Sequence, residues 1–126
     1  MNTSELDIIH IPSFLLEKDA NELFSQIQEN VFLSGQMNTD AKVLGMPRLI
    51  KWFGEIGYGY SSIYHPPQVI PNYILEKMHL INEFLKNRQI ESKMNSVLLN
   101  YYRDGKDKIN YHSDDLSQIG DEPVIS

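Results

Sequence analysis

The chain has 126 residues, of which 41% are hydrophobic and 22% charged, and it contains no cysteine. The length is typical of one domain. The lack of cysteine excludes disulfide scaffolds, thiolate metal sites and cysteine nucleophiles, and no run of about eighteen apolar residues predicts a membrane span. Because the acidic N-terminus lacks the layout of a signal peptide, we expect an intracellular protein, in the cytoplasm or, in a eukaryote, the nucleus.

The net charge of −6 is spread unevenly along the chain. The charge balance is −5 over residues 1–39, +3 over residues 40–110 and −4 over residues 111–126. A basic middle segment suits phosphate groups, although ordinary solvated surface gives the same pattern. Charge alone therefore does not identify a nucleic-acid partner.

The first third of the chain is predicted to contain a short strand, a helix and a loop. Residues 7–11 contain three isoleucines and end at Pro12, which is typical of a strand. Residues 17–29 follow a helical period, and residues 34–47 are polar and loop-like. The apolar stripe of this helix consists of Ala20, Leu23, Phe24, Ile27 and Val31.

The next segment is rich in aromatic residues and short strands. Residues 48–53 are predicted to form a strand, with Trp52 and Phe53 in the core. Residues 54–59 contain three glycines and are predicted to form turns. Residues 62–64 are predicted to form a further short strand.

A second helix is expected to begin near Pro71, which suits a first helical turn. Residues 95–102 then read as a buried strand, Asp104-Gly105 as a turn and residues 108–112 as the returning strand. Residues 123–125 resemble the start of another strand, so we expect the chain to be the N-terminal portion of a longer domain. The core face of the second helix consists of Ile74, Met78, Ile81 and Leu85.

His112 and Asp114 are the strongest candidates for chemistry. On a strand they would share a face, and one imidazole with one carboxylate is part of the ligand triad that holds non-haem Fe(II). Such a triplet is weak evidence alone, because polar surface turns contain it too. Asn100 and Tyr102 also lie two residues apart, and their amide and hydroxyl donors suit a small anionic ligand.

Other metal sites fit the sequence less well. A calcium loop that starts at Asp104 fails, because Lys106 occupies the third position and the glycine is at the wrong offset. His10, His65 and His79 have no ligand-like neighbours at useful spacing, so we interpret them as structural.

The segment from Asn100 to Asp115 resembles the signature of AlkB-type Fe(II)/2-oxoglutarate dioxygenases, the oxidative dealkylation repair family. Upstream, Pro47-Arg48-Leu49 with residues 52–55 and 58–61 resembles the nucleotide-recognition lid of that family. The resemblance covers nearly the whole chain in the correct order. It implies an α/β fold in which two helices buttress an incomplete double-stranded β-helix, or jelly roll, truncated at its C-terminal side. Residues 1–126 would then form one domain, the N-terminal part of the dioxygenase domain.

The resemblance also implies roles for individual residues. His112 and Asp114 would bind Fe(II), and Asn100 and Tyr102 would hydrogen-bond the co-substrate 2-oxoglutarate. Tyr60 would stack on the damaged base, as aromatic faces do with flipped or single-stranded bases. The other implied substrate contacts are Tyr58, Arg48 and Asp115.

The implied function is oxidative demethylation of N-alkylated bases in single- or double-stranded DNA or RNA, with the alkyl carbon released as an aldehyde. Two departures from the family pattern bear on activity. The second iron histidine and the arginines that bind 2-oxoglutarate would lie beyond Ser126, and Leu116 replaces a usual acidic residue. The alternatives are a non-catalytic remnant that binds single strands weakly, and a protein or lipid hydroxylase of the same fold.

Overall fold

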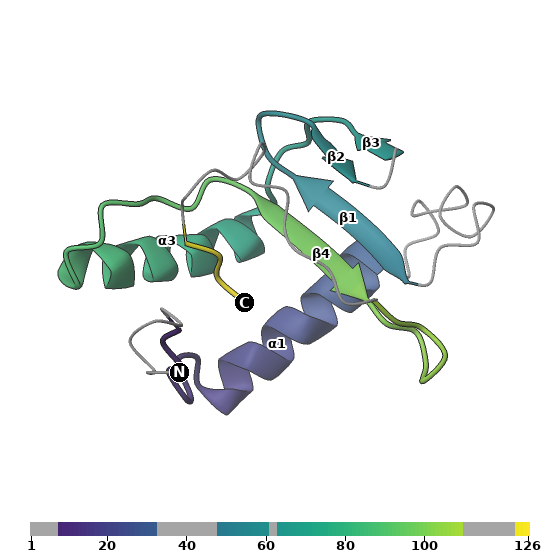
Figure 1. Cartoon of the computed structure of the whole chain (residues 1–126). Coiled ribbons are helices and arrows are strands. Elements are labelled where there is room, and N and C mark those ends of the chain that lie inside the picture. Colours follow the sequence, from purple (N-terminus) through teal and green to yellow (C-terminus); the bar gives the residue numbers. More distant parts are fainter. Residues whose placement is uncertain (1–7, 33–47, 61–62, 110–122) are drawn as a thin grey trace, which may run out of the picture.

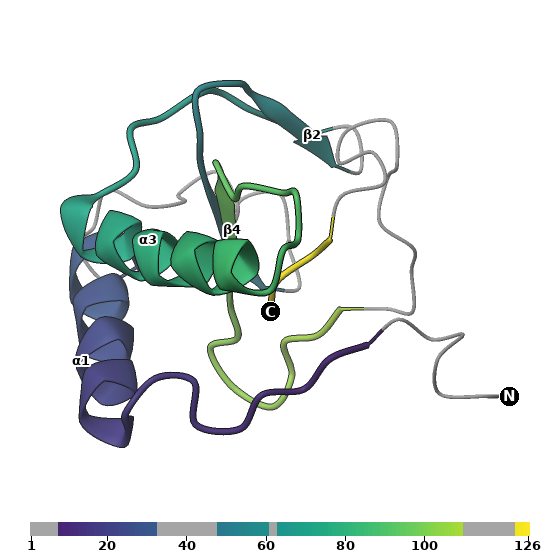
Figure 2. The ribbon, with the colours of Figure 1, turned by 90° about the vertical axis from the view of Figure 1, so that its left-hand side faces the viewer.

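A computed structural model of the chain describes residues 8–32, 48–60, 63–109 and 123–126. Its elements, in chain order, are α1 (Glu17–Ile27), the π-helical turn η2 (Gln28–Phe32), β1 (Leu49–Phe53), β2 (Tyr58–Tyr60), β3 (Ile63–His65), α3 (Asn72–Asn87) and β4 (Val97–Tyr101). The long strands β1 and β4 lie side by side, with the β2–β3 hairpin near the C-terminal end of β1 (Figure 1). The helices α1 and α3 cross each other beside the strands (Figure 2).

The strands form two separate antiparallel sheets of two strands each. In the larger sheet, β1 pairs with β4 so that Leu49 lies opposite Tyr101. The hairpin is attached to this sheet by backbone hydrogen bonds between Gly54 and Gln68, with N···O distances of 2.8 and 2.9 Å. Helices and antiparallel strands are thus present as expected, although the described strands alone do not form a double-stranded β-helix.

The core lies between the helices and one face of the β1–β4 sheet. Because strand side chains alternate between faces, the face that packs on the helices carries Leu49, Phe53, Val97, Leu99 and Tyr101. The opposite face, here called the distal face, carries Ile50, Trp52, Leu98 and Asn100. The buried members of the core cluster are Val31, Phe32, Phe53, Ile74 and Met78.

The first helix differs from the prediction at its C-terminal end. It is α-helical only to Ile27 and continues as the π-helical turn η2, in which the consecutive residues Val31 and Phe32 are both buried. Consecutive residues of a helix point about 100° apart, so both are buried where the core covers a wide part of its surface. The predicted stripe was wrong at Phe24, which is 59% exposed, and at Ala20, which is also exposed.

The second helix is confirmed. It begins at Asn72, directly after Pro71, which occupies the N-cap position. Its predicted core face is buried at Ile74, Met78 and Leu85 and half-buried at Ile81. Within the described ranges, no helix is long and apolar enough to cross a membrane.

Four of the predicted strand and turn assignments were wrong where the structure describes them. The described part of the first predicted strand, residues 8–11, has no strand pairing among the described residues, and Ile8 and Ile9 are exposed. Residues 58–60 form a strand in place of a turn, because the tyrosines of this segment pair with β3. Residues 108–109 and 123–125 are not in strands.

The strand β4 is confirmed, but its centre was predicted to be buried on both faces. Val97, Leu98 and Leu99 are only half-buried. Val97 and Leu99 pack against the edge of the core cluster, whereas Leu98 lies on the distal face.

Candidate functional site

Two of the predicted site residues, Arg48 and Asn100, are joined by a hydrogen bond at one end of the β1–β4 sheet. The Nε of Arg48 donates to Oδ1 of Asn100 over 2.8 Å, and its Nη1 lies 3.4 Å from the carbonyl oxygen of Lys108. The register of the strands explains the contact, because a residue just before β1 lies diagonally across from Asn100, within reach of a long side chain. Arg48 is only 4% exposed, so its charge is held inside the protein by these bonds.

The turn after β4 is fixed by a local ion pair. Arg103 binds Asp107 through Nε (2.7 Å), Nη2 (2.9 Å) and its backbone N–H (2.8 Å), and Asp104 accepts from the Lys106 N–H. The Arg103 side-chain hydrogen bond lowers the pKa of Asp107, and the same bond raises the pKa of Arg103. Residues 108–109 of the predicted return strand are not in a strand, and its remaining residues, 110–112, lie outside the described part of the chain. Tyr102, predicted to share a face with the strand residue two positions before it, lies beyond the end of β4 and is exposed.

Three aromatic rings form a stack between β1 and the hairpin. The rings of Trp52 and Tyr58 are 4.8 Å apart and within 17° of parallel, and Tyr58 lies 6.3 Å from His65. The Trp52 indole N–H donates to the carbonyl oxygen of Ile56 over 2.7 Å. The prediction of Trp52 as a core residue was therefore wrong, and the reason is strand alternation: Phe53 faces the core, so its neighbour cannot.

His65 is the residue of this aromatic stack that the sequence did not identify. Its Nε2 is buried and has no hydrogen-bond partner in the described part of the chain. Burial lowers the pKa of His65, and the positive charge of Lys51 lowers it further. The imidazole is therefore neutral at pH 7. His65 joins the aromatic stack because it lies opposite Tyr58 in the β2–β3 hairpin. The sequence alone does not give the register of this hairpin.

The aromatic stack and the Arg48–Asn100 pair share the distal face of the sheet. Trp52 lies opposite Leu98, which precedes Asn100 by two residues, or roughly 7 Å along a strand. Tyr60 is the last residue of β2, and its side chain lies outside the described residues. An aromatic surface beside an amide donor suits a ligand that combines a flat ring with a nearby anion.

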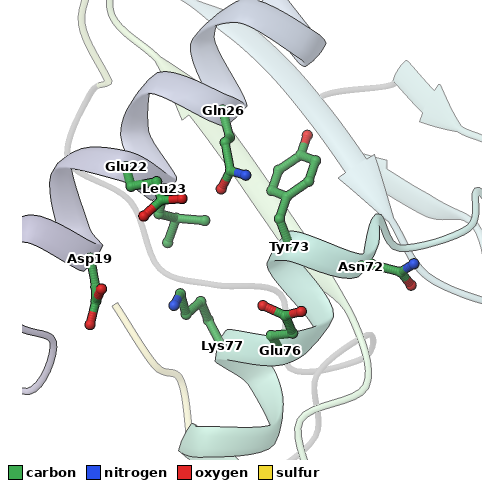
Figure 3. A pocket seen from close by; sticks show the side chains of 8 residues that line it. All are labelled: Asp19, Glu22, Leu23, Gln26, Asn72, Tyr73, Glu76 and Lys77. Carbon is green, nitrogen blue, oxygen red and sulfur yellow. The ribbon is translucent and has the colours of Figure 1, made fainter.

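A groove between α1 and α3 is lined mainly by acidic and polar side chains, unlike the aromatic distal face (Figure 3). It encloses about 390 Å³, and Lys77 extends into it from α3 towards α1. Its three carboxylates outnumber its one ammonium group, which disfavours phosphate groups. The groove belongs to the helical layer, on the other side of the sheet from Asn100. The lining residues are Asp19, Glu22, Leu23, Gln26, Asn72, Tyr73, Glu76 and Lys77.

Comparison with known protein families shows to which family the chain belongs. Residues 7–126 match the family model of the 2OG-Fe(II) oxygenase superfamily. The chain belongs to this superfamily. Similar proteins include the alpha-ketoglutarate-dependent dioxygenase alkB homolog 3 of mouse (34% identity over 116 residues), cattle (35% over 120) and human (33% over 119). Each match covers 91% of this chain and 39% of the relative, so the chain spans about two-fifths of the length of these relatives.

The AlkB-type resemblance is thereby confirmed, and with it the membership of a family of Fe(II)/2-oxoglutarate-dependent oxygenases. The superfamily consists of dioxygenases that use Fe(II) and 2-oxoglutarate. The predicted iron ligands His112 and Asp114 and the predicted substrate contact Asp115 lie outside the described residues. Among the residues that the structure does describe, no group of three or more carboxylate and imidazole side chains is placed to hold a metal ion. The donor types of the predicted pair suit Fe(II), and the Asn100 amide suits the anionic co-substrate.

Proposed function

We propose that this protein oxidatively removes alkyl groups from N-alkylated bases of single- or double-stranded DNA or RNA, with Fe(II), O2 and 2-oxoglutarate. The observation that carries the proposal is the distal face of the β1–β4 sheet. There Trp52, which belongs to the aromatic stack, lies opposite Leu98, two residues before the amide of Asn100. The names of the relatives, alpha-ketoglutarate-dependent dioxygenases, support the co-substrate. We propose that the protein acts in the cytoplasm or, in a eukaryote, the nucleus. We further propose that β1 and β4 belong to a jelly-roll sheet.

The residues of this chain divide between the co-substrate and the base. Asn100 donates an amide N–H to a carboxylate of 2-oxoglutarate, and the Tyr102 hydroxyl donates to the same anion. Tyr60 stacks on the alkylated base, and the aromatic stack around Tyr58 holds the hairpin that carries it. Asp115 is a further proposed contact of the base.

His112 and Asp114 are the proposed ligands of Fe(II), which supplies the activation of O2 when bound. One oxygen atom enters the alkyl carbon, and the other enters 2-oxoglutarate as it loses CO2 to become succinate. The bond between the base nitrogen and the hydroxylated carbon then breaks, and the carbon leaves as an aldehyde. The chain's part is to hold the two organic substrates in contact with one metal site.

The experiment that tests the proposal uses the purified full-length protein and a single-stranded oligonucleotide that carries one N-methylated base. Mass spectrometry of the product measures methyl removal. His112→Ala and Asp114→Ala are expected to abolish turnover and to leave oligonucleotide binding largely intact. Tyr60→Ala removes a stacking face worth about 1–3 kcal/mol, so it should raise the KM about 5- to 150-fold.

Tyr64→Ala is the matched control, because Tyr64 lies in the same hairpin but is exposed and outside the aromatic stack. We expect it to change the KM less than twofold. Normal turnover by Asp114→Ala would show that the metal is bound elsewhere. Binding of the oligonucleotide with no turnover by the wild type would favour a non-catalytic single-strand binder.

A further inference from the structure

The hydrogen bond between Arg48 and Asn100 determines which way the Asn100 amide faces. An asparagine side chain has an oxygen acceptor on one side and an NH₂ donor on the other, with nearly the same shape. The Arg48 guanidinium can only donate, so the atom 2.8 Å from its Nε is the oxygen Oδ1. The NH₂ group is therefore directed away from the guanidinium.

The two partners of this bond differ in their freedom to move. Arg48 is buried, and its Nη1 also reaches the backbone of Lys108, so the guanidinium is a fixed point. Asn100 is exposed on the distal face, and within the described part of the chain its NH₂ group donates no hydrogen bond. The fixed arginine thus holds an otherwise mobile donor, and that donor remains available to a ligand.

We propose that Arg48 is a positioning residue that orients the Asn100 amide towards a carboxylate of 2-oxoglutarate. This inference rests on the proposed function and replaces the role implied for Arg48 by the resemblance, which was contact with the nucleic acid. A buried side chain that already donates to Asn100 is poorly placed to reach a phosphate or a base.

The size of the effect follows from the conformations that the contact excludes. Without Arg48, the Asn100 side chain has about three staggered χ1 wells and two amide orientations. If one of these six combinations binds the carboxylate, the competent fraction falls to about one in six. The Kd for 2-oxoglutarate should therefore rise about sixfold.

A double-mutant cycle on 2-oxoglutarate binding tests the proposal. The purified full-length protein is loaded with Fe(II) without oxygen and titrated calorimetrically with 2-oxoglutarate. Arg48→Met, which keeps the aliphatic length, should raise the Kd about sixfold. In the Asn100→Ala background, the same Arg48→Met change should have no further effect. The Kd for a methylated oligonucleotide should stay unchanged.

Asn100→Asp provides a second test that leaves the buried arginine in place. An aspartate accepts from Arg48 as well as asparagine does, but it has no N–H to donate. We expect it to weaken 2-oxoglutarate binding at least as much as Asn100→Ala. Asn82→Ala is the matched control, because it removes a side-chain amide whose hydrogen bonds lie elsewhere, to the Met94 backbone at 2.7 and 3.1 Å. It should lower the melting temperature and leave the Kd unchanged.

The possible outcomes separate the two proposals. If Arg48→Met weakens 2-oxoglutarate binding equally in both backgrounds, its charge acts directly and the positioning role is wrong. Weaker oligonucleotide binding by Arg48→Met, or wild-type affinity of Asn100→Asp for 2-oxoglutarate, would also overturn it. If the wild-type protein does not bind 2-oxoglutarate at all, the proposed function itself fails.

Discussion

Gly54 is the position at which the aromatic stack leaves least room. A Cβ added there would lie 3.0 Å from the Ser96 Cβ and 3.1 Å from the Trp52 ring. The backbone cannot easily retreat, because it exchanges two hydrogen bonds with Gln68. The Trp52 ring is held as well, by the Ile56 carbonyl oxygen and by the stacked tyrosine. Gly54→Ala should therefore displace the indole.

The expected cost combines two opposing effects. Carbon atoms pack best at about 3.5–4.0 Å, and overpacking a filled region costs about 1–3 kcal/mol. Against this, the alanine restricts the unfolded chain and so stabilises by about 0.4–1 kcal/mol. The net loss should be about 1–2 kcal/mol. Gly105→Ala is the matched control, because nothing lies within 4 Å of its added Cβ, and its effect should stay within about 0.5 kcal/mol.

Urea unfolding followed by tryptophan fluorescence measures both effects, because Trp52 is the only tryptophan of the chain. With a denaturant slope of about 2 kcal/mol per molar, the Gly54→Ala midpoint should fall by about 0.5–1 M. The emission of its folded state should also shift, since the indole moves relative to Tyr58. An unchanged midpoint together with unchanged native emission would refute the packing of Trp52 against Gly54 and the hairpin.

Two further predictions concern stability. The lowered pKa of His65 means that the unfolded chain takes up a proton near the ordinary value of 6.5 before the folded protein does. Stability is therefore full above about pH 6.5 and falls as the pH drops below it, and His65→Gln should flatten this slope in melts between pH 5 and 8; an equal slope would contradict the burial of the imidazole. Leu85→Ala should cost about 2.7–5 kcal/mol because Leu85 is 2% exposed, whereas Leu80→Ala, at 49% exposed on the same helix, should cost less than about 1 kcal/mol; equal midpoint shifts in urea would contradict the packing of α3.

The sequence predicted the elements whose periodicity is strong and regular. The α3 core face was readable because Ile74, Met78, Ile81 and Leu85 repeat at spacings of four, three and four. The strands β1 and β4 were readable because their apolar runs are short and bounded by polar residues. The end of α1 was not readable, because a π-helical turn changes the period inside one apolar segment.

Individual residues of the candidate site were predicted, but the contacts between them were not. The resemblance identified Arg48 and Asn100 separately, but their contact depends on the register between β1 and β4, which joins positions 52 residues apart. The aromatic stack required a further register, that of the hairpin, which pairs Tyr58 with His65. The misplacement of Trp52 was avoidable, since two neighbouring strand residues cannot face the same core.

The most direct test of the central claim is to measure succinate and aldehyde in one reaction with a methylated oligonucleotide. In the full-length wild-type protein, each methyl group removed should yield one succinate and one formaldehyde, and omission of 2-oxoglutarate or Fe(II) should abolish both products. Asp114→Ala should also yield neither. Methyl removal that continues without 2-oxoglutarate, or in Asp114→Ala, would contradict the account.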